Sequence, residues 1–292
     1  MSSLRAAVYV APAIPWYKPN GVEGGPWSPI SSTLIYGERE AVLVDTPITT
    51  EQTRELADWI ARTLGPSKRL TSLYITHGHG DHWFGIPTLV SRFPGLTVVA
   101  TKGTISHMRD EASPQGFKRW NSQFPNQIDQ PFRFDVIREL PASGEFLLED
   151  HLIKAIEVGH SDTHHSTILW VPDLKLAVCG DVVYGEVHQM LAIANKKELR
   201  EEWIRAVEKV QGLRPELVVP GHQKPGEMHG TWHLENTKQY IKDFAYLVES
   251  GEANDARSLS GKMMDKYPNR FNKGALVASS VSAFALQKKP SL

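Results

Sequence analysis

Three histidines and one aspartate lie within six consecutive residues in the run Thr-His-Gly-His-Gly-Asp-His. They are His77, His79, Asp81 and His82. Neutral imidazoles and carboxylates are ligands that suit Zn²⁺, Mn²⁺ and Fe²⁺. Gly78 and Gly80 allow the backbone to bend tightly enough for these side chains to converge. The run therefore predicts a metal site.

An expected strand and an expected helix must position this cluster. Residues 70–75 read Leu-Thr-Ser-Leu-Tyr-Ile, which is typical of a buried strand, and residues 83–87 form an apolar helix start. Open α/β folds bind ligands beyond the carboxyl ends of their strands. We therefore expect the four side chains at such an edge.

Three further candidate ligands occur later in the chain, each a His or Asp beside a glycine and just after an apolar strand-like run. They are His160 after residues 153–158, Asp181 after residues 174–178 and His222 after residues 217–219. This recurrence predicts that they complete the metal site. Asp162, two residues after His160, either orients a ligand histidine or caps the turn.

Together these blocks resemble the metallo-β-lactamase fold superfamily of hydrolases. The resemblance covers at least residues 35–222 and includes Asp45 in Val-Leu-Val-Asp-Thr. It implies that Asp45 supports the metal loop without binding metal, and that each chain holds two zinc ions, or iron or manganese in their place. One ion would be held by His77, His79 and His160 and the other by Asp81, His82 and His222, with Asp181 bridging them.

The resemblance also implies an α/β fold, namely a four-layer αββα sandwich of two mixed sheets flanked by helices. We expect one domain over residues 1–292 with a C-terminal helical extension. The pattern itself indicates a hairpin around Gly37. Spaced apolar residues predict helices at 51–64, 199–210, 234–250 and 259–265.

The chemistry implied is attack on a carbonyl carbon by a hydroxide that two metals share, with Asp81 accepting a hydrogen bond from it. Tyr184 follows Asp181 by three residues. In N-acyl-homoserine lactonases of this superfamily, a tyrosine at that offset points at the substrate carbonyl, where a phenol can stabilise an oxyanion. The alternative is a tyrosine packed under the loop. Asp81, Asp181 and Tyr184 are thus the candidate catalytic residues.

Aromatic residues near the predicted metal site suit a small, partly apolar substrate. Trp27 belongs to a Gly/Pro-rich aromatic loop at residues 16–27, and Trp83 adjoins the metal loop. His188 is either a substrate contact, a leaving-group proton donor or a residue outside the pocket. We expect Trp27, Trp83, Tyr184 and His188 to contact the substrate.

Hydrolysis of a lactone or lactam is the leading hypothesis. A glyoxalase-type thioesterase is one alternative, although no basic cluster follows Asp181 to bind glutathione carboxylates. An iron-dependent redox protein on the same ligand frame is another, although no flavin domain is evident. The hypothesis expects a small-molecule substrate and leaves the oligomeric state open.

The composition of the chain narrows the functional classes that remain. The 292 residues are 41% hydrophobic and 22% charged, with a formal net charge of −1. Such a balance provides no field to gather nucleic acid or an anionic membrane, and no apolar run is long enough to span a bilayer. The single cysteine, Cys179, excludes an internal disulfide and is expected to be buried in a strand. We expect a cytoplasmic protein.

Overall fold

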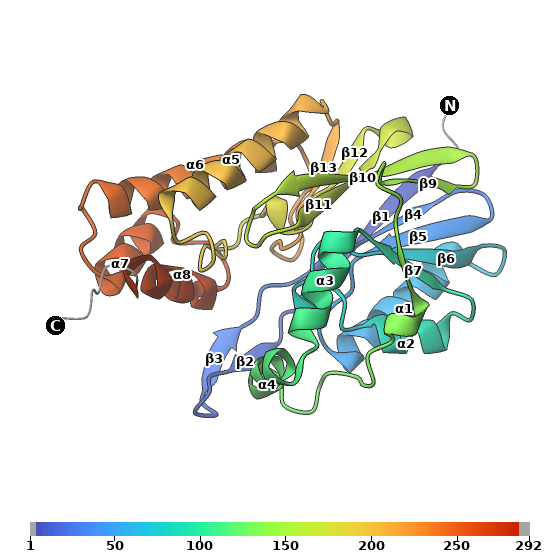
Figure 1. The fold of residues 1–292 in the computed structure, drawn as a ribbon, viewed down its shortest axis with the longest axis horizontal. Helices are drawn as coiled ribbons and strands as arrows, with labels where there is room; N and C mark the ends of the chain where they lie inside the picture. The colour runs from blue at the N-terminus through green and yellow to red at the C-terminus, as the bar shows by residue number, and fades with distance from the viewer. Residues whose placement is uncertain (1–3, 286–292) are drawn as a thin grey trace.

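The computed structural model describes residues 4–285, so the two ends of the predicted 1–292 domain lie outside it. Two sheets face each other between outer layers of helices (Figure 1). This arrangement confirms the predicted αββα fold class. Within residues 4–285, no helix is both long and apolar enough to cross a membrane.

The first sheet has six strands in the order β1-β4-β5-β6-β7-β8. Their bounds are β1 (Arg5–Val10), β4 (Ser31–Tyr36), β5 (Glu40–Val44), β6 (Arg69–Tyr74), β7 (Thr97–Ala100) and β8 (Ile137–Glu139). β4 and β5 form the hairpin predicted around Gly37. The pairs β5–β6, β6–β7 and β7–β8 are parallel. The carboxyl ends of these strands therefore meet at one edge.

The second sheet has five strands in the order β13-β12-β11-β10-β9. Their bounds are β9 (Glu145–Leu148), β10 (His151–Gly159), β11 (Ser166–Val171), β12 (Leu176–Val178) and β13 (Leu217–Val219). Only β12 and β13 pair in parallel among these strands. A separate small hairpin, β2 (Pro15–Tyr17) and β3 (Glu23–Pro26), contains much of the predicted aromatic loop.

The helices are α1 (Thr50–Leu64), α2 (Ile86–Arg92), α3 (Lys102–Glu111), α4 (Pro114–Gln123), α5 (Lys197–Gly212), α6 (Trp232–Glu249), α7 (Ala256–Lys266) and α8 (Lys273–Ala285). The four predicted helices correspond to α1, α5, α6 and α7. Thr49 and Gln52 form a capping box that starts α1. The sequence analysis missed α3, α4 and α8, although Thr101 and Ser113 cap the first two.

Three clusters of buried apolar side chains join the four layers. Leu34, Leu43 and Leu73 of the first sheet pack with Leu56 and Ile60 of α1. A second cluster lies between the sheets and includes Ile35 and Val42 with Ile153 and Leu169. A third joins the second sheet to α5 and α6 through Ile168, Trp203 and Phe244. Burial on both faces fixes the two sheets relative to each other, and with them the loops at their edges.

Candidate metal centre

The predicted metal loop follows β6 and contains a short 3-10 turn, Gly80–His82. Asp45, at the end of β5, fastens this loop. Its Oδ1 accepts a hydrogen bond from the Thr76 amide at 2.9 Å, and its Oδ2 lies 2.9 Å from Nδ1 of His82. Asp45 itself has a φ of 59°, which aspartate tolerates better than most residues. It supports the loop from outside the ligand clusters, as the resemblance implied.

The second sheet brings its own candidate ligands to the same edge. Asp181 lies in a 3-10 turn after β12, and His222 comes soon after β13. Asp181 Oδ1 is 3.2 Å from Nε2 of His82, and its Oδ2 is 3.3 Å from Nε2 of His222. The His222 Nε2 also lies 3.6 Å from Oδ2 of Asp81. Asp181 therefore stands between ligands from both sheets.

In the described part of the chain, residues 4–285, three groups of side chains each place their ligand atoms within 4.8 Å of one another. The groups are His77 with His79 and Asp162, His77 with His82 and Asp181, and Asp81 with His82 and His222. His77 Nε2 is buried without a hydrogen-bond partner, and the buried oxygens Asp162 Oδ2 and Asp181 Oδ1 face ring nitrogens of the same cluster. Buried polar and charged groups are costly unless they are paired, and divalent cations would satisfy these atoms together. The donor set therefore fits a binuclear metal centre.

Buried charges in the cluster compensate one another. Burial alone would raise the pKa of Asp181, but the neighbouring His222 and His82 hold it well below its ordinary value. Burial opposes the charged form of His82, yet the carboxylates of Asp181 and Asp45 raise its pKa well above the ordinary value. Burial lowers the pKa of His77 well below the ordinary value. Metal ions bound at this cluster would displace the histidine protons that balance the negative charge of Asp181.

The role of His160 as a metal ligand, which the resemblance implied, stays a prediction. Both of its ring nitrogens are buried without a hydrogen-bond partner, and it belongs to none of the three groups. Asp162 lies beside His79 instead, with Oδ2 2.7 Å from the Nδ1 of that ring. Burial and the two carboxylates nearby, Asp162 and Glu202, act on the pKa of His160, which is lowered overall because burial dominates.

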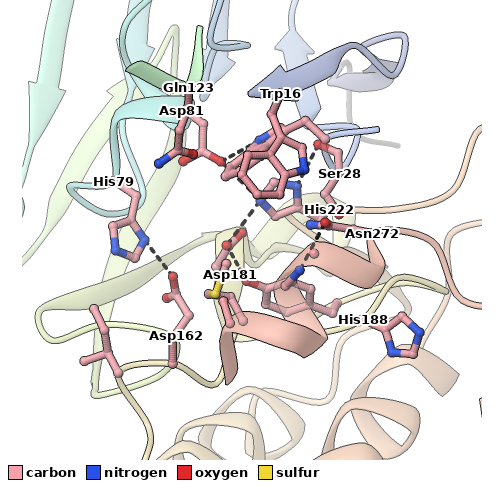
Figure 2. A pocket seen from close by; sticks show the side chains of 18 of the residues that line it. Trp16, Ser28, His79, Asp81, Gln123, Asp162, Asp181, His188, His222 and Asn272 are labelled. Carbon is pink, nitrogen blue, oxygen red and sulfur yellow. Dashed lines mark hydrogen bonds and ion pairs between the residues drawn. The ribbon is translucent and has the colours of Figure 1, made fainter. Parts of the chain in front are cut away.

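A cavity of ≈ 320 Å³ opens onto the cluster. Figure 2 shows His79 and Asp162 on one side of it, Asp181 near the centre and His188 on the far side. Its other walls come from separate elements: Trp16 and Trp27 near the β2–β3 hairpin, Arg119, Trp120 and Gln123 of α4, Met190 and Ile193, and Asn272 and Ala275 at the start of α8. Its volume suits a small molecule.

The structure places three of the four predicted substrate residues at this cavity, namely Trp27, Tyr184 and His188. Trp27 Nε1 donates to Oδ2 of Asp81 at 3.2 Å. Trp83 is the exception. It is 1% exposed, donates to the Gly78 carbonyl and packs against Phe84 and Phe132 in the core. The prediction that Trp83 contacts substrate is wrong, because the turn after His82 directs this ring inward.

The side chains of Tyr184 and His188 each make one hydrogen-bond contact. The Tyr184 hydroxyl donates to Asp181 Oδ2 at 2.5 Å, and its ring stacks on His222. His188 Nδ1 lies 2.9 Å from the Tyr240 hydroxyl, while its Nε2 is buried without a partner. Sequence reasoning missed Arg119 and Gln123 of α4 and the α8 residues of the wall. The cap Ser113 before Pro114 was the available signal for α4.

Residues 25–222 match the family model described as the metallo-beta-lactamase superfamily. The chain belongs to this superfamily. It is 24% identical over 226 residues to a metallo-beta-lactamase type 2 from Bacteroides fragilis, a match covering 76% of this chain and 79% of that one. The superfamily assignment and this relative make the chain a metal-dependent hydrolase, and confirm the family resemblance.

Two further comparisons bear on the superfamily assignment. The chain is 28% identical over 195 residues to an atrochrysone carboxyl ACP thioesterase from Aspergillus fumigatus, covering 66% of this chain but 37% of that protein. The solved metallo-beta-lactamase from Pontibacter korlensis superposes with a TM-score of 0.55 at 19% identity, covering 82% of this chain and 99% of that one. The second likeness concerns the fold alone.

Proposed function

We propose that this protein is a zinc-dependent hydrolase that opens a small cyclic ester or amide, a lactone or lactam. The observation that carries the proposal is the cavity itself. It combines apolar walls, including Trp16, Trp27 and Trp120, with a floor that contains Asp81 and Asp181. Such a cavity suits a compact, partly apolar molecule whose carbonyl group reaches the metal ligands.

Two bound zinc ions would supply a hydroxide nucleophile at neutral pH and polarise the carbonyl group. The chain's own residues would orient the reaction. Asp81 is held by the Trp27 indole N–H, which leaves its carboxylate facing His222 and the cavity. Trp27 thus contributes both to the wall and to the position of a candidate ligand.

Tyr184 is the proposed hydrogen-bond donor to the substrate oxygen. Burial, with the nearby Asp181 carboxylate, raises the pKa of its phenol well above the ordinary value, so the hydroxyl keeps its proton at neutral pH. That single proton goes to Asp181 Oδ2 in the structure. Stabilising an oxyanion therefore requires Tyr184 to exchange this carboxylate for the substrate oxygen.

His188 is the proposed contact for a second polar group of the substrate. Burial lowers its pKa to about 4, helped by Arg270 and Lys273, so the imidazole is neutral. Among residues 4–285, the Tyr240 hydroxyl contacts no acceptor other than His188 Nδ1, and donation to this nitrogen satisfies it. The proton of His188 then lies on Nε2, which would donate to a substrate oxygen.

The proposal is tested by kinetics on matched substrates with zinc-loaded protein. The panel contains a γ-lactone and a β-lactam, each with and without an acylamino substituent, and a thioester with the same acyl group. We expect kcat/KM to be highest for a lactone or lactam. Activity restricted to the thioester would overturn the proposal.

A thioesterase is the second candidate, because the chain is similar to an ACP thioesterase over 195 residues. The same floor of carboxylates and histidines would accept a thioester carbonyl. A long carrier arm would have to leave through the mouth of the cavity, where Ile193 is 44% exposed. Ile193→Trp should then slow the thioester with a long leaving group while sparing a small lactone.

A further inference from the structure

We propose that residues 270–272, which lie between α7 and α8, complete the substrate site. In this inference, Asn272 donates a hydrogen bond to an acceptor oxygen of the substrate, and Arg270 positions this donor beside His188. The inference rests on the proposed function, because His188 is the substrate contact that Asn272 would join. The match to the superfamily model ends at residue 222, so it does not extend to this segment.

The main chain of Phe271 pairs with the segment that carries His188. Its carbonyl accepts a hydrogen bond from the His188 N–H at 2.8 Å, and its own N–H donates to the Glu186 carbonyl at 3.1 Å. Val187 and Phe271 form a parallel bridge. The next residues on the two sides are His188 and Asn272, and both line the cavity (Figure 2). The C-terminal helices therefore contribute directly to this wall.

The side-chain amide of Asn272 has one end engaged and one end available. Its Oδ1 accepts a hydrogen bond from the Ala275 N–H at 3.2 Å in the first turn of α8. A main-chain N–H needs an oxygen acceptor, so the NH₂ group is turned away from it. Among residues 4–285, no acceptor forms a hydrogen bond with this NH₂ group. Asn272 is buried and lines the cavity, so an oxygen of a bound ligand would satisfy the donor.

His188 is an independent indication of a ligand at this wall. Its side chain is buried, and its Nε2 has no hydrogen-bond partner. Because Nδ1 faces the Tyr240 hydroxyl, Nε2 carries the proton and is a second neutral donor. Burial, helped by the nearby cations Arg270 and Lys273, lowers the pKa of His188 to about 4. The two donors and the two cations favour an oxygen with full or partial negative charge, from either a carboxylate or an amide.

Arg270 holds the two donors in register. Its Nη1 donates to the Val187 carbonyl at 2.8 Å. Its guanidinium lies 4.7 Å from the ring centroid of Tyr240 and 4.8 Å from that of Tyr267. Arg270 thus contacts both the main chain before His188 and the ring whose hydroxyl fixes the His188 tautomer. A planar guanidinium can stack and donate in the same place, which a lysine ammonium does less well.

The experiment measures equilibrium binding to the zinc-loaded full chain with three probes that cannot be hydrolysed. Cyclopentanone supplies a ring carbonyl alone, a second probe adds an acetamido group on the α-carbon, and a third adds a carboxylate on the β-carbon. Trp16, Trp27 and Trp120 line the cavity, so tryptophan fluorescence reports binding. In the wild type, we expect one substituted probe to bind about tenfold more tightly than cyclopentanone. The tighter probe identifies the kind of oxygen.

Asn272→Asp removes the donor and keeps an oxygen that can cap α8. It should weaken the preferred probe about tenfold or more and cyclopentanone less than about twofold, since only the substituent loses a partner. Asn126→Asp is the matched control, because Asn126 has a similar φ of 59° and is exposed outside the cavity wall. If Asn272→Asp does not fold, Asn272→Gly takes its place, since glycine suits the φ of 56°.

Arg270→Lys should weaken the same probe about tenfold, with metal content unchanged and cyclopentanone affected far less. Arg200→Lys alters a buried arginine of α5 outside the cavity wall and controls for a general loss of stability, which thermal unfolding measures. Equal losses of probe affinity in these two variants would show that Arg270 does not position the donors.

Two results would refute the role of Asn272. One is a wild type that binds neither substituted probe more tightly than cyclopentanone. The other is an Asn272→Asp variant that weakens all three probes equally. Because the probes are not hydrolysed, these results stand apart from the proposed function, whose failure is seen separately in the kinetic panel.

Discussion

Oδ2 of Asp45 lies 2.9 Å from Nδ1 of His82, which joins the end of β5 to the metal loop. The same oxygen accepts from the Thr76 hydroxyl at 2.7 Å. A proton on Nδ1 leaves the Nε2 of His82 free to face Asp181 at 3.2 Å. Asp45 thereby selects the tautomer and the ring orientation that metal binding requires.

Asp45→Asn should weaken binding of the ion that His82 holds by roughly 10–100-fold, because an amide is a poorer acceptor for the imidazole N–H. Metal titration with a competing chelator measures the change. Asp135→Asn, which alters an exposed carboxylate paired with Arg133, is the control. Equal affinities in the two variants would remove Asp45 from the metal site.

Asp181→Ala should lower the metal content below about two ions per chain and abolish hydrolysis, since its oxygens lie between His82 and His222. His222→Ala should deplete the second ion selectively. Elemental analysis after gel filtration tests both expectations. Full activity of a chelator-stripped wild type would show that the reaction needs no metal.

Tyr184→Phe should lower kcat roughly tenfold to a hundredfold and leave metal content intact. Loss of one oxyanion donor typically costs about 10²–10³, and a metal ion would share the charge here. Steady-state kinetics on the best lactone or lactam measure the effect. Tyr246→Phe removes an exposed hydroxyl and serves as control. An unchanged kcat would leave Tyr184 with a packing role only.

His188→Gln and Tyr240→Phe should both raise KM more than they lower kcat, for substrates with a second polar group only. The first variant replaces the rigid imidazole N–H by a flexible amide donor, and the second removes the Tyr240 hydroxyl that fixes the tautomer of His188. The acylamino and unsubstituted members of the substrate panel provide the comparison. Equal losses on both members would mean that His188 does not contact the second group.

His188 should also make stability depend on pH. Its pKa is lowered from 6.5 to about 4 in the fold, chiefly by burial, so the unfolded chain binds more protons between these values. The contribution of the neutral His188 ring to the free energy of unfolding is therefore present above pH 6.5 and is lost as pH falls toward 4. Urea unfolding should show the advantage of wild type over His188→Gln shrinking by roughly 2 kcal/mol between pH 7 and pH 4. A constant difference would contradict this linkage.

The sequence determined the metal loop because its signal is local. His77, His79, Asp81 and His82 follow a buried strand directly and are separated by glycines. This local order leaves few positions for them other than the turn at the end of that strand. The same rule located Asp181 and His222, each at the end of a strand. Helical spacing found α1, α5, α6 and α7 for a similar reason, since one apolar face must be buried.

Only the tertiary structure decided which side chains share the site. Trp83 is next to the ligands in sequence but turns into the core, while Trp16, Trp120 and Ala275, far apart in sequence, line one cavity. Likewise, His160 and Asp162 are two residues apart, and the turn after β10 brings the carboxylate to His79. Such proximity depends on how loops from two packed sheets are oriented, which residue spacing within one segment does not encode.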